Sequence, residues 1–429
     1  MPIKKPAFYT FGIPIKGKKN LTNTIQITNI AEPNEVAISL SQHIGQPSTL
    51  IVKVGDYVKK GQLIAKASSK VSANIFASVS GTIIDIKDLK VSGGLTQTHV
   101  IIKNSFTDEF EYLPNMPDFS KESIIKRIEE AGIVGLGGAG FPTSIKVQPT
   151  TTIDTLVVNG AECEPYLTCD HRLMLERKYK LLKGIELLKI ALGITNVYIG
   201  IEVNKPDVID LYKDEDLFVV PLKKLYPGGS EKHLIYATTK RKVPPQKMPF
   251  DVGVVVQNVK TILAIYDACY ENEPLIKTVI TVSGKGINTP KNLIVPIGTS
   301  TSYIIDYCGG QKNDVVKVIC GGPMMGKAIN NEVFTKKTDC GLLLLTKEEA
   351  SLNAPTNCIR CGRCIKACPM NLEPVFIEFY TLAKDYETAK KYGTLNCIEC
   401  GACSYVCPAK RPLVQSIQFS KQMLREAKK

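Results

Sequence analysis

Two cysteine-rich stretches near the end of the chain share one spacing. Residues 358–369 read Cys-Ile-Arg-Cys-Gly-Arg-Cys-Ile-Lys-Ala-Cys-Pro, and residues 397–408 read Cys-Ile-Glu-Cys-Gly-Ala-Cys-Ser-Tyr-Val-Cys-Pro. In proteins that hold two [4Fe–4S] clusters, the first three cysteines of such a run bind one cluster and the fourth reaches the other. The sequence therefore predicts two clusters, one held by Cys358, Cys361, Cys364 and Cys407 and the other by Cys397, Cys400, Cys403 and Cys368.

Zinc is the alternative occupant of paired Cys-x-x-Cys motifs. A structural zinc ion takes only four ligands and does not require a doubled run that ends in Cys-Pro, so iron–sulfur clusters are the better interpretation. A disulfide framework is not expected, because the first residues, Met-Pro-Ile-Lys-Lys-Pro, lack the apolar segment of an export signal. The default for most of the other cysteines is a small buried hydrophobe. Two adjacent clusters indicate an electron relay.

The composition is that of a soluble multidomain protein. The chain has 429 residues, of which 44% are hydrophobic and 22% charged. Its apolar runs are far shorter than the ~18–20 residues that span a bilayer, so we expect a cytosolic chain. The net charge of +13 suits an anionic partner or membrane surface, but no basic and aromatic nucleic-acid module is present. Residues 350–429 carry 12 Lys/Arg and 6 Asp/Glu, an excess that partly offsets about −2 per oxidised cluster.

Residues 118–273 are predicted to form a Rossmann-like α/β domain. Strands expected at 155–159, 197–203, 218–222 and 252–256 alternate with helices at 120–132, 171–192, 231–238 and 259–270. This alternation predicts a mainly parallel sheet covered on both faces. The helix at 171–192 is expected to bury one face, made of Leu175, Tyr179, Leu182, Ile185, Leu188 and Leu192.

Three further modules are predicted around this domain. Residues 1–115 have short apolar stretches between turn glycines and resemble the β-rich hammerhead fold of biotinyl and lipoyl carriers. Lys70 lies near the position that carriers modify, but it lacks their flanking methionines and acidic neighbour, which favours a structural module. Residues 274–346 are expected to form a β-grasp module with a short helix within 297–309. Residues 350–429 form the α-helical, ferredoxin-like two-cluster domain, which ends in an amphipathic helix at 413–429.

A glycine-rich loop and an acidic strand end mark a candidate binding site in the α/β domain. Residues 135–143 read Gly-Leu-Gly-Gly-Ala-Gly-Phe-Pro-Thr, follow a helix and match neither the dinucleotide nor the nucleotide-triphosphate loop. Lys146 follows the loop, and the strand at 155–159 leads into Asn-Gly-Ala-Glu-Cys-Glu-Pro at 159–165. Ligands gather at the carboxyl ends of parallel strands. Residues 226–231, Tyr-Pro-Gly-Gly-Ser-Glu, open a helix whose first amides suit a phosphate.

These motifs, with Gln-Asn-Val at 257–259, resemble the NADH-oxidising flavin subunit of respiratory complex I. The order of modules is more similar to the RnfC family, a subunit of the ion-translocating NAD:ferredoxin oxidoreductases of the Rnf type. Residues 41–45 (Ser-Gln-His-Ile-Gly), residues 54–61 (Val-Gly-Asp-Tyr-Val-Lys-Lys-Gly) and the doubled cysteine run are typical of that family. The resemblance covers nearly the whole chain.

The resemblance implies roles for individual residues. FMN would be bound non-covalently by Gly135, Gly137, Gly138, Lys146, Asn159, Glu162, Gly229 and Asn258. NAD(H) would meet Phe141 at the adenine and Glu231 and Glu164 near the nicotinamide nucleotide, with Glu164 the candidate catalytic residue. The chain departs from complex I at two positions, since Leu136 stands where an arginine is usual and Ser230 replaces an acidic residue.

The resemblance also implies a function. A nicotinamide delivers two electrons as a hydride whereas a cluster accepts one, and a flavin converts between the two. We therefore expect a peripheral subunit on the cytoplasmic face of the cell membrane, which passes electrons to integral-membrane partners that translocate ions, with ferredoxin reached through the complex and no nucleic acid bound. The alternatives are a cobalamin reductase of the related microcompartment family, a hydrogenase or formate dehydrogenase flavin subunit, and a ferredoxin-like adaptor without flavin.

Overall fold

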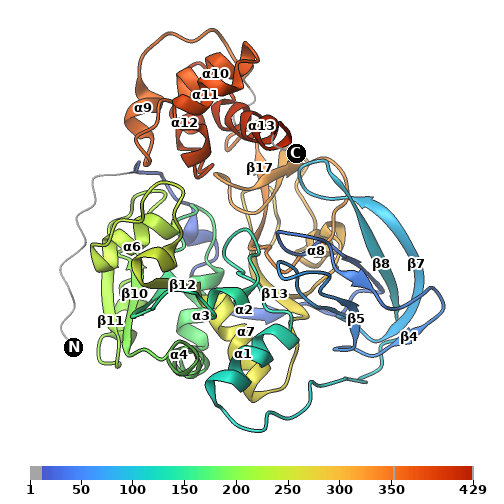
Figure 1. The fold of residues 1–429 in the computed structure, drawn as a ribbon. Coiled ribbons are helices and arrows are strands. Elements are labelled where there is room, and N and C mark those ends of the chain that lie inside the picture. The colour runs from blue at the N-terminus through green and yellow to red at the C-terminus, as the bar shows by residue number, and fades with distance from the viewer. Residues whose placement is uncertain (1–11, 351–352, 428–429) are drawn as a thin grey trace.

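The computed structural model describes residues 12–350 and 353–427. The first residues of the chain and the last two of the predicted C-terminal helix lie outside this range. Three modules form the main body, and the helical domain with the cysteine motifs lies against one end of it (Figure 1). No helix among the described residues is long and apolar enough to cross a membrane.

A four-stranded parallel sheet forms the centre of the α/β domain. Its order is β11 (Phe218–Leu222), β10 (Asn196–Glu202), β9 (Thr155–Gly160) and β12 (Val254–Asn258). Side chains of β9 alternate between two cores, with Leu156 and Val158 in one and Val157 in the other. The first core is covered by α1 (Lys121–Glu130), α4 (Lys178–Leu192), α5 (Pro206–Tyr212) and α7 (Val259–Tyr270), and the second by α6 (Glu231–Thr239). The prediction of a parallel sheet covered on both faces is confirmed.

The helix predicted at 171–192 is in fact two helices. The chain leaves helical geometry at Arg177, where φ is −124°, between α3 (Cys169–Glu176) and α4. The break changes the buried face, so the side chain of Tyr179 is 68% exposed instead of buried. The residues of α4 that are buried are Leu181, Gly184, Ile185, Leu187, Leu188 and Ala191. Gly184 permits close packing, because a Cβ atom there would lie 2.6 Å from Ile262 of α7.

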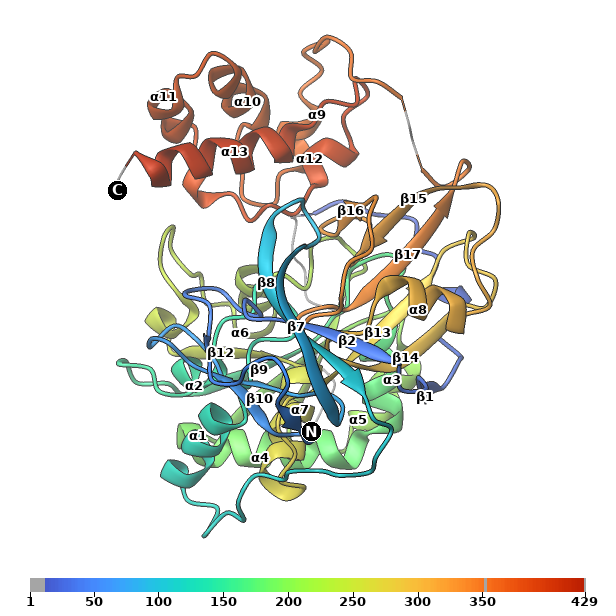
Figure 2. The same ribbon diagram turned by 90° about the vertical axis from the view of Figure 1, so that its right-hand side faces the viewer.

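The N-terminal module consists of two small sheets packed face to face. One has the order β2 (Glu35–Ser39), β8 (Thr96–Asn104), β7 (Gly81–Lys90) and β4 (Tyr57–Val58). The other has the order β3 (Thr49–Leu50), β5 (Leu63–Lys66) and β6 (Ile75–Phe76). The long β7 and β8 form a curved hairpin along the outside of the molecule (Figure 2). Lys70 is exposed on the bend between β5 and β6.

The β-grasp module has a six-stranded sheet and one helix, α8 (Thr301–Tyr307). Its strand order is β1 (Ile27–Asn29), β14 (Lys291–Pro296), β13 (Lys277–Ser283), β17 (Gly341–Thr346), β15 (Val315–Cys320) and β16 (Lys327–Ile329). The first strand pairs in parallel with β14, although about 260 residues separate them in the sequence. Residues before the N-terminal module therefore complete the β-grasp sheet, a pairing that the sequence did not reveal.

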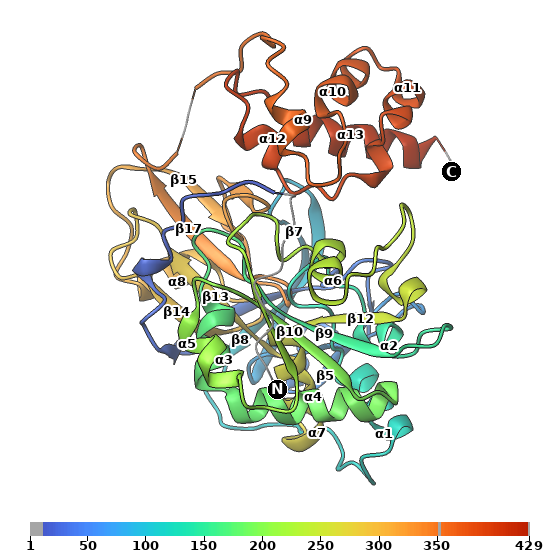
Figure 3. The same ribbon diagram turned by 90° about the vertical axis from the view of Figure 1, so that its left-hand side faces the viewer.

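The helical domain contains α9 (Arg363–Ala367), α10 (Pro374–Leu382), α11 (Tyr386–Lys391), α12 (Ala402–Tyr405) and α13 (Leu413–Glu426). The short helices α9 and α12 begin at equivalent places in the two cysteine motifs, each after a glycine with positive φ. The domain lies across the ends of the α/β and β-grasp modules (Figure 3). Described residues thus form the four types of module that the sequence predicted.

Candidate functional site

The glycine-rich loop is closed at its base by a bridge between Val134 and Pro142. The Gly135 amide donates a hydrogen bond to the Phe141 carbonyl at 2.9 Å. Gly137 admits no side chain, since a Cβ atom there would lie 2.7 Å from the Asn258 amide. Gly138 differs, because it is exposed and nothing lies within 4 Å of the position of a Cβ atom. The loop therefore presents an open stretch of backbone at Gly138.

Leu136, where complex I carries arginine, is buried. Its amide donates to Thr261 Oγ1 at 3.0 Å, and its side chain joins the core of the N-terminal module. This departure from complex I thus serves the contact between the glycine loop and a neighbouring module.

Two predicted site residues at the end of β9 have structural partners. The Asn159 amide group donates to the Gly229 carbonyl at 2.9 Å, which links β9 to the loop before α6. Glu162 has a positive φ of 46°, and its carboxylate accepts hydrogen bonds from Asp170 N at 2.7 Å and His171 N at 3.3 Å. These two amides belong to the first turn of α3, so Glu162 stabilises that helix end.

Two lysines that the sequence did not single out hold this strand end from below. Lys19 Nζ donates to the carbonyls of Glu162 at 2.7 Å and Leu167 at 2.5 Å, and lies 3.7 Å from the Glu162 carboxylate. The fully buried Lys205 donates to the Ala161 carbonyl at 2.6 Å. Burial lowers the pKa of Lys205, with a further contribution from Lys19. Both contacts span more than 40 residues of sequence, and no local pattern indicates them.

The other predicted flavin contacts form a polar chain along the carboxyl edge of the sheet. Asn258 caps α7 by accepting from Lys260 N at 2.8 Å, and its amide group donates to Asp170 at 2.7 Å. Burial, together with the nearby Glu162, raises the pKa of Asp170. Lys146 Nζ donates to Glu231 Oε1 at 2.9 Å, so a predicted flavin residue and a predicted nucleotide residue form an ion pair.

Glu164, the candidate catalytic residue, contacts the β-grasp module. Its two carboxylate oxygens accept hydrogen bonds from Met324 N at 3.1 Å and Met325 N at 2.9 Å. Burial raises the pKa of Glu164 to about 7. The same turn leaves no room for a side chain at Gly322, whose Cβ atom would lie 2.3 Å from Glu164. These contacts give Glu164 a part in joining two modules.

The two cysteine motifs have the same backbone conformation. Arg360 and Gly362 have φ values of 56° and 70°, and their counterparts Glu399 and Gly401 have 57° and 76°. In each loop an amide points at the first thiol, at 3.4 Å from Arg360 N to Cys358 and 3.3 Å from Glu399 N to Cys397. Such amides stabilise sulfur that carries negative charge.

The fourth cysteine of each motif lies with the first three of the other. Burial raises the pKa of Cys403 to about 12, and the neighbouring thiols Cys397, Cys400 and Cys368 add to the shift. On the other side, burial raises the pKa of Cys364 and the nearby Cys407 adds to it. The pKa of Arg411 is raised mainly by its hydrogen bond to Glu378, and also by the Cys358 and Cys407 thiols. The structure thus brings together cysteines from both motifs, in the crossed pattern expected of two clusters.

The second motif is seated on the α/β and β-grasp modules. The buried hydroxyl of Tyr226 donates to the Cys400 carbonyl at 2.6 Å. His233 Nε2 lies 2.9 Å from the Pro369 carbonyl, and a Cβ atom on Gly401 would lie 2.6 Å from the Met324 carbonyl. Cys400 and Cys403 are buried, whereas Cys358 and Cys361 of the first motif are exposed.

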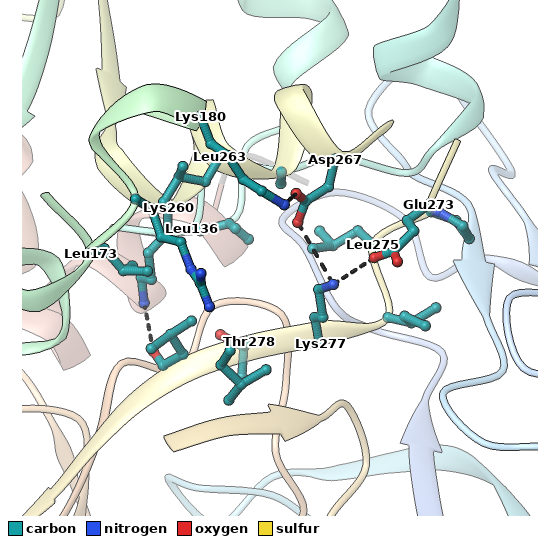
Figure 4. Close-up of a pocket in the computed structure, with 16 residues that line it drawn as sticks. Leu136, Leu173, Lys180, Lys260, Leu263, Asp267, Glu273, Leu275, Lys277 and Thr278 are labelled. Carbon is teal, nitrogen blue, oxygen red and sulfur yellow. Dashed lines mark hydrogen bonds and ion pairs between the residues drawn. The ribbon is translucent and has the colours of Figure 1, made fainter. Parts of the chain in front are cut away.

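A separate cavity lies between α7 and β13, behind the glycine loop (Figure 4). Leu136, Leu173 and Leu263 contribute apolar walls, and Lys277 pairs with both Asp267 and Glu273 beside it. Within the described part of the chain, its lining includes none of the predicted flavin or nucleotide contacts. We therefore place the candidate site at the carboxyl edge of the sheet and not in this cavity.

Curated relatives match the chain over nearly its full length. It is 46% identical over 427 residues to the RnfC-type subunit of the proton-translocating ferredoxin:NAD(+) oxidoreductase complex of Clostridium ljungdahlii, covering 96% of this chain and 93% of the relative. It is 43% identical to the corresponding subunit of an ion-translocating oxidoreductase complex of Rhodobacter capsulatus, covering 97% and 83%. The figures for the same subunit of the Na(+)-translocating ferredoxin:NAD(+) oxidoreductase complex of Acetobacterium woodii are 40%, 96% and 95%. The chain belongs to the RnfC family.

Family models divide this member of the RnfC family into the expected modules. The RnfC barrel sandwich hybrid domain matches residues 8–107, the Nuo51 FMN-binding domain 128–267, the SLBB domain 279–328 and the 4Fe-4S dicluster domain 351–408. The chain therefore contains a domain for FMN and a domain for two [4Fe–4S] clusters, as predicted. A solved NAD+-reducing [NiFe]-hydrogenase has a similar fold, with a TM-score of 0.50 and 16% identity over 72% of this chain and 63% of that one.

Proposed function

We propose that this chain is the NADH-, flavin- and iron–sulfur-binding subunit of a membrane-bound Rnf-type ferredoxin:NAD oxidoreductase. It exchanges hydride with NAD(H) and passes electrons singly toward integral-membrane partner subunits that translocate ions. It is attached peripherally at the cytoplasmic face of the membrane. Membership of the RnfC family and the four matched modules support this proposal.

The residues at the carboxyl edge of the sheet suit a bound FMN. The open backbone at Gly138 lets a phosphate or ring approach closely, which a side chain would prevent. We assign FMN to Gly135, Gly137, Gly138, Lys146, Asn159, Glu162, Gly229 and Asn258. Among these, Lys146 supplies the positive charge, while Asn159 and Asn258 offer amide groups already fixed by hydrogen bonds. Fixed polar groups hold a ligand at little cost in ordering.

We assign NAD(H) to Phe141, Glu231 and Glu164. Phe141 is half-buried on the glycine loop, and Glu231 begins α6 beside Lys146. Glu164 lies farther from these two in its contacts, because both of its oxygens accept amides of the β-grasp turn. Its role toward the nicotinamide is therefore to fix the position of the turn that borders the site.

We propose the cluster ligands as Cys358, Cys361, Cys364 and Cys407 for one cluster and Cys397, Cys400, Cys403 and Cys368 for the other. When bound, the flavin takes up the hydride pair and the clusters carry electrons one at a time. The contact from Tyr226 to Cys400 carries the proposal, because it joins the α/β module directly to a ligand loop. The second-motif cluster is thus adjacent to the flavin, and the first-motif cluster lies toward the outside.

The proposed module boundaries are 1–115, 118–273, 274–346 and 350–429. They follow the sequence prediction, with residues 27–29 lending a strand to the β-grasp sheet across the first boundary. The boundaries place every proposed flavin residue in one module and every cluster ligand in another.

Anaerobic addition of NADH to the reconstituted chain, without an added acceptor, tests this function. Both the flavin absorbance and the broad iron–sulfur absorbance should bleach, and the chain should hold about eight irons and eight sulfides. Bleaching of the flavin alone, or zinc in place of iron, would contradict the relay. Co-isolation with integral-membrane subunits distinguishes this function from that of a cobalamin reductase.

A further inference from the structure

The two cysteine motifs share a backbone but not an environment. In the second motif, Glu399 pairs with Lys421 at 2.6 Å and accepts from Gln418 at 3.0 Å, so α13 covers the loop. The other side of that loop contacts Tyr226 of the α/β module. Since the backbones match, any difference in function between the motifs must come from what surrounds them.

The first motif faces solvent. Every residue from 353 to 361 is exposed, including the ligand candidates Cys358 and Cys361. Ile359, between them, is 67% exposed, whereas its counterpart Ile398 packs against the core around Tyr226. An apolar side chain this exposed, beside a redox centre, marks a contact site.

The first-motif loop and the helix that follows it carry only positive charge. Arg360, Arg363 and Lys366 are exposed, and residues 353–372 contain no Asp or Glu. Arginine offers a planar array of donors that matches carboxylates, and complementary charge guides two proteins to the correct orientation.

The loop is also fixed before any partner binds. Arg411 donates to the Thr356 carbonyl at 3.2 Å and to the Glu378 carboxylate at 2.6 Å. Glu378 belongs to α10, so the loop is anchored to a helix of the same domain. A surface ordered in advance costs less to bind than a mobile one.

We propose that residues 353–366, the first-motif surface, dock the electron-accepting subunit of the complex through an acidic patch that surrounds an apolar centre. This inference rests on the proposed function and names its exit. The second-motif cysteines are covered by the flavin module, so the exposed first-motif cysteines are where an acceptor can approach. Ile359 fills the apolar centre, and Arg360, Arg363 and Lys366 form the basic rim.

Arg360→Glu tests the surface with little risk to the fold. It converts Cys-Ile-Arg-Cys into Cys-Ile-Glu-Cys, the sequence that the second motif already folds with the same φ at Glu399. Lys384→Glu is the matched control, because Lys384 is exposed on the same domain, has a φ of 60° and changes the charge equally. Each variant is expressed with the other subunits, and retention on membranes is measured against NaCl concentration.

Arg360→Glu should be released at lower salt than the wild type, with affinity reduced about fivefold at low ionic strength, as expected for exposed charge pairs. Lys384→Glu should behave as the wild type. Equal retention of all three proteins, or equal loss from both variants, would overturn the docking surface. Iron, sulfide and flavin contents are measured in parallel, since their absence from the wild type would defeat the proposed function instead.

Discussion

At the scale of single residues, two neighbouring glycines in the flavin loop are subject to different constraints. Gly137 is glycine because a Cβ atom would collide with Asn258, whereas Gly138 has open space. A substitution at Gly137 therefore disturbs the protein itself, and one at Gly138 disturbs only what binds there. The pair separates folding from ligand binding.

We expect Gly138→Val to keep the fold and lose FMN. Its side chain would occupy the open space through which the flavin backbone contacts are made. Thermal stability without flavin should stay within about 1 kcal/mol of the wild type, while flavin affinity measured by fluorescence titration should be lost. Full flavin retention in this variant would remove the loop from the site.

Glu164 predicts a dependence of stability on pH. Burial holds its pKa at about 7, above the ordinary value of 4.5, so the folded chain binds the proton more tightly than the unfolded chain. The stability that this proton contributes is present below pH 4.5 and is lost as the pH rises to about 7. The free energy of unfolding of the wild type should therefore fall by about 3 kcal/mol relative to Glu164→Gln over that range.

Urea unfolding followed by tyrosine fluorescence at pH 5 and pH 8 measures this difference. Glu129→Gln, at an exposed position on α1, is the control and should show no such slope. A parallel pH profile for the wild type and Glu164→Gln would mean that the carboxyl does not titrate in contact with the β-grasp turn.

At the scale of elements, the cysteine motifs cross between the two halves of the helical domain. Cys368 lies after α9 in the first motif, but its thiol is grouped with Cys397, Cys400 and Cys403. We expect Cys368→Ser to damage the second-motif cluster and leave the first largely intact. Iron content should fall toward half, and paramagnetic resonance of the reduced protein should show which cluster signal is lost. Loss of the first-motif signal instead would mean that the ligands do not cross.

The elements also show how far sequence carries. The strands and helices of the α/β domain and the crossed cysteines could be predicted because their signals are local, a periodicity or a spacing. The break at Arg177 could not, because the apolar residues on both sides of it continue a helical pattern. The pairing of β1 with β14 and the contact of Glu164 with Met324 join residues more than 150 positions apart, and only the folded chain brings them together.

At the scale of the whole molecule, the helical domain and the flavin module meet at a polar contact within an apolar cluster. Tyr226 lies among Ile13, Ala367, Cys400 and Ala402 and is 2% exposed. Its hydroxyl hydrogen bond to the Cys400 carbonyl is therefore shielded from water, where such a bond fixes geometry more firmly than at the surface. This contact sets the separation between the proposed flavin site and the second-motif ligands.

Tyr226→Phe should weaken this junction without touching either cofactor. The change removes one buried hydrogen bond, worth about 1 kcal/mol, and leaves the Cys400 carbonyl without that donor. Stopped-flow mixing with NADH should show flavin bleaching at the wild-type rate and slower bleaching of the iron–sulfur absorbance, because electron transfer depends steeply on separation. Tyr179→Phe, at a 68% exposed position on α4, is the control and should change neither phase. If the two phases in Tyr226→Phe both match the wild type, the electrons do not pass through this junction, and the second-motif cluster is not the one next to the flavin.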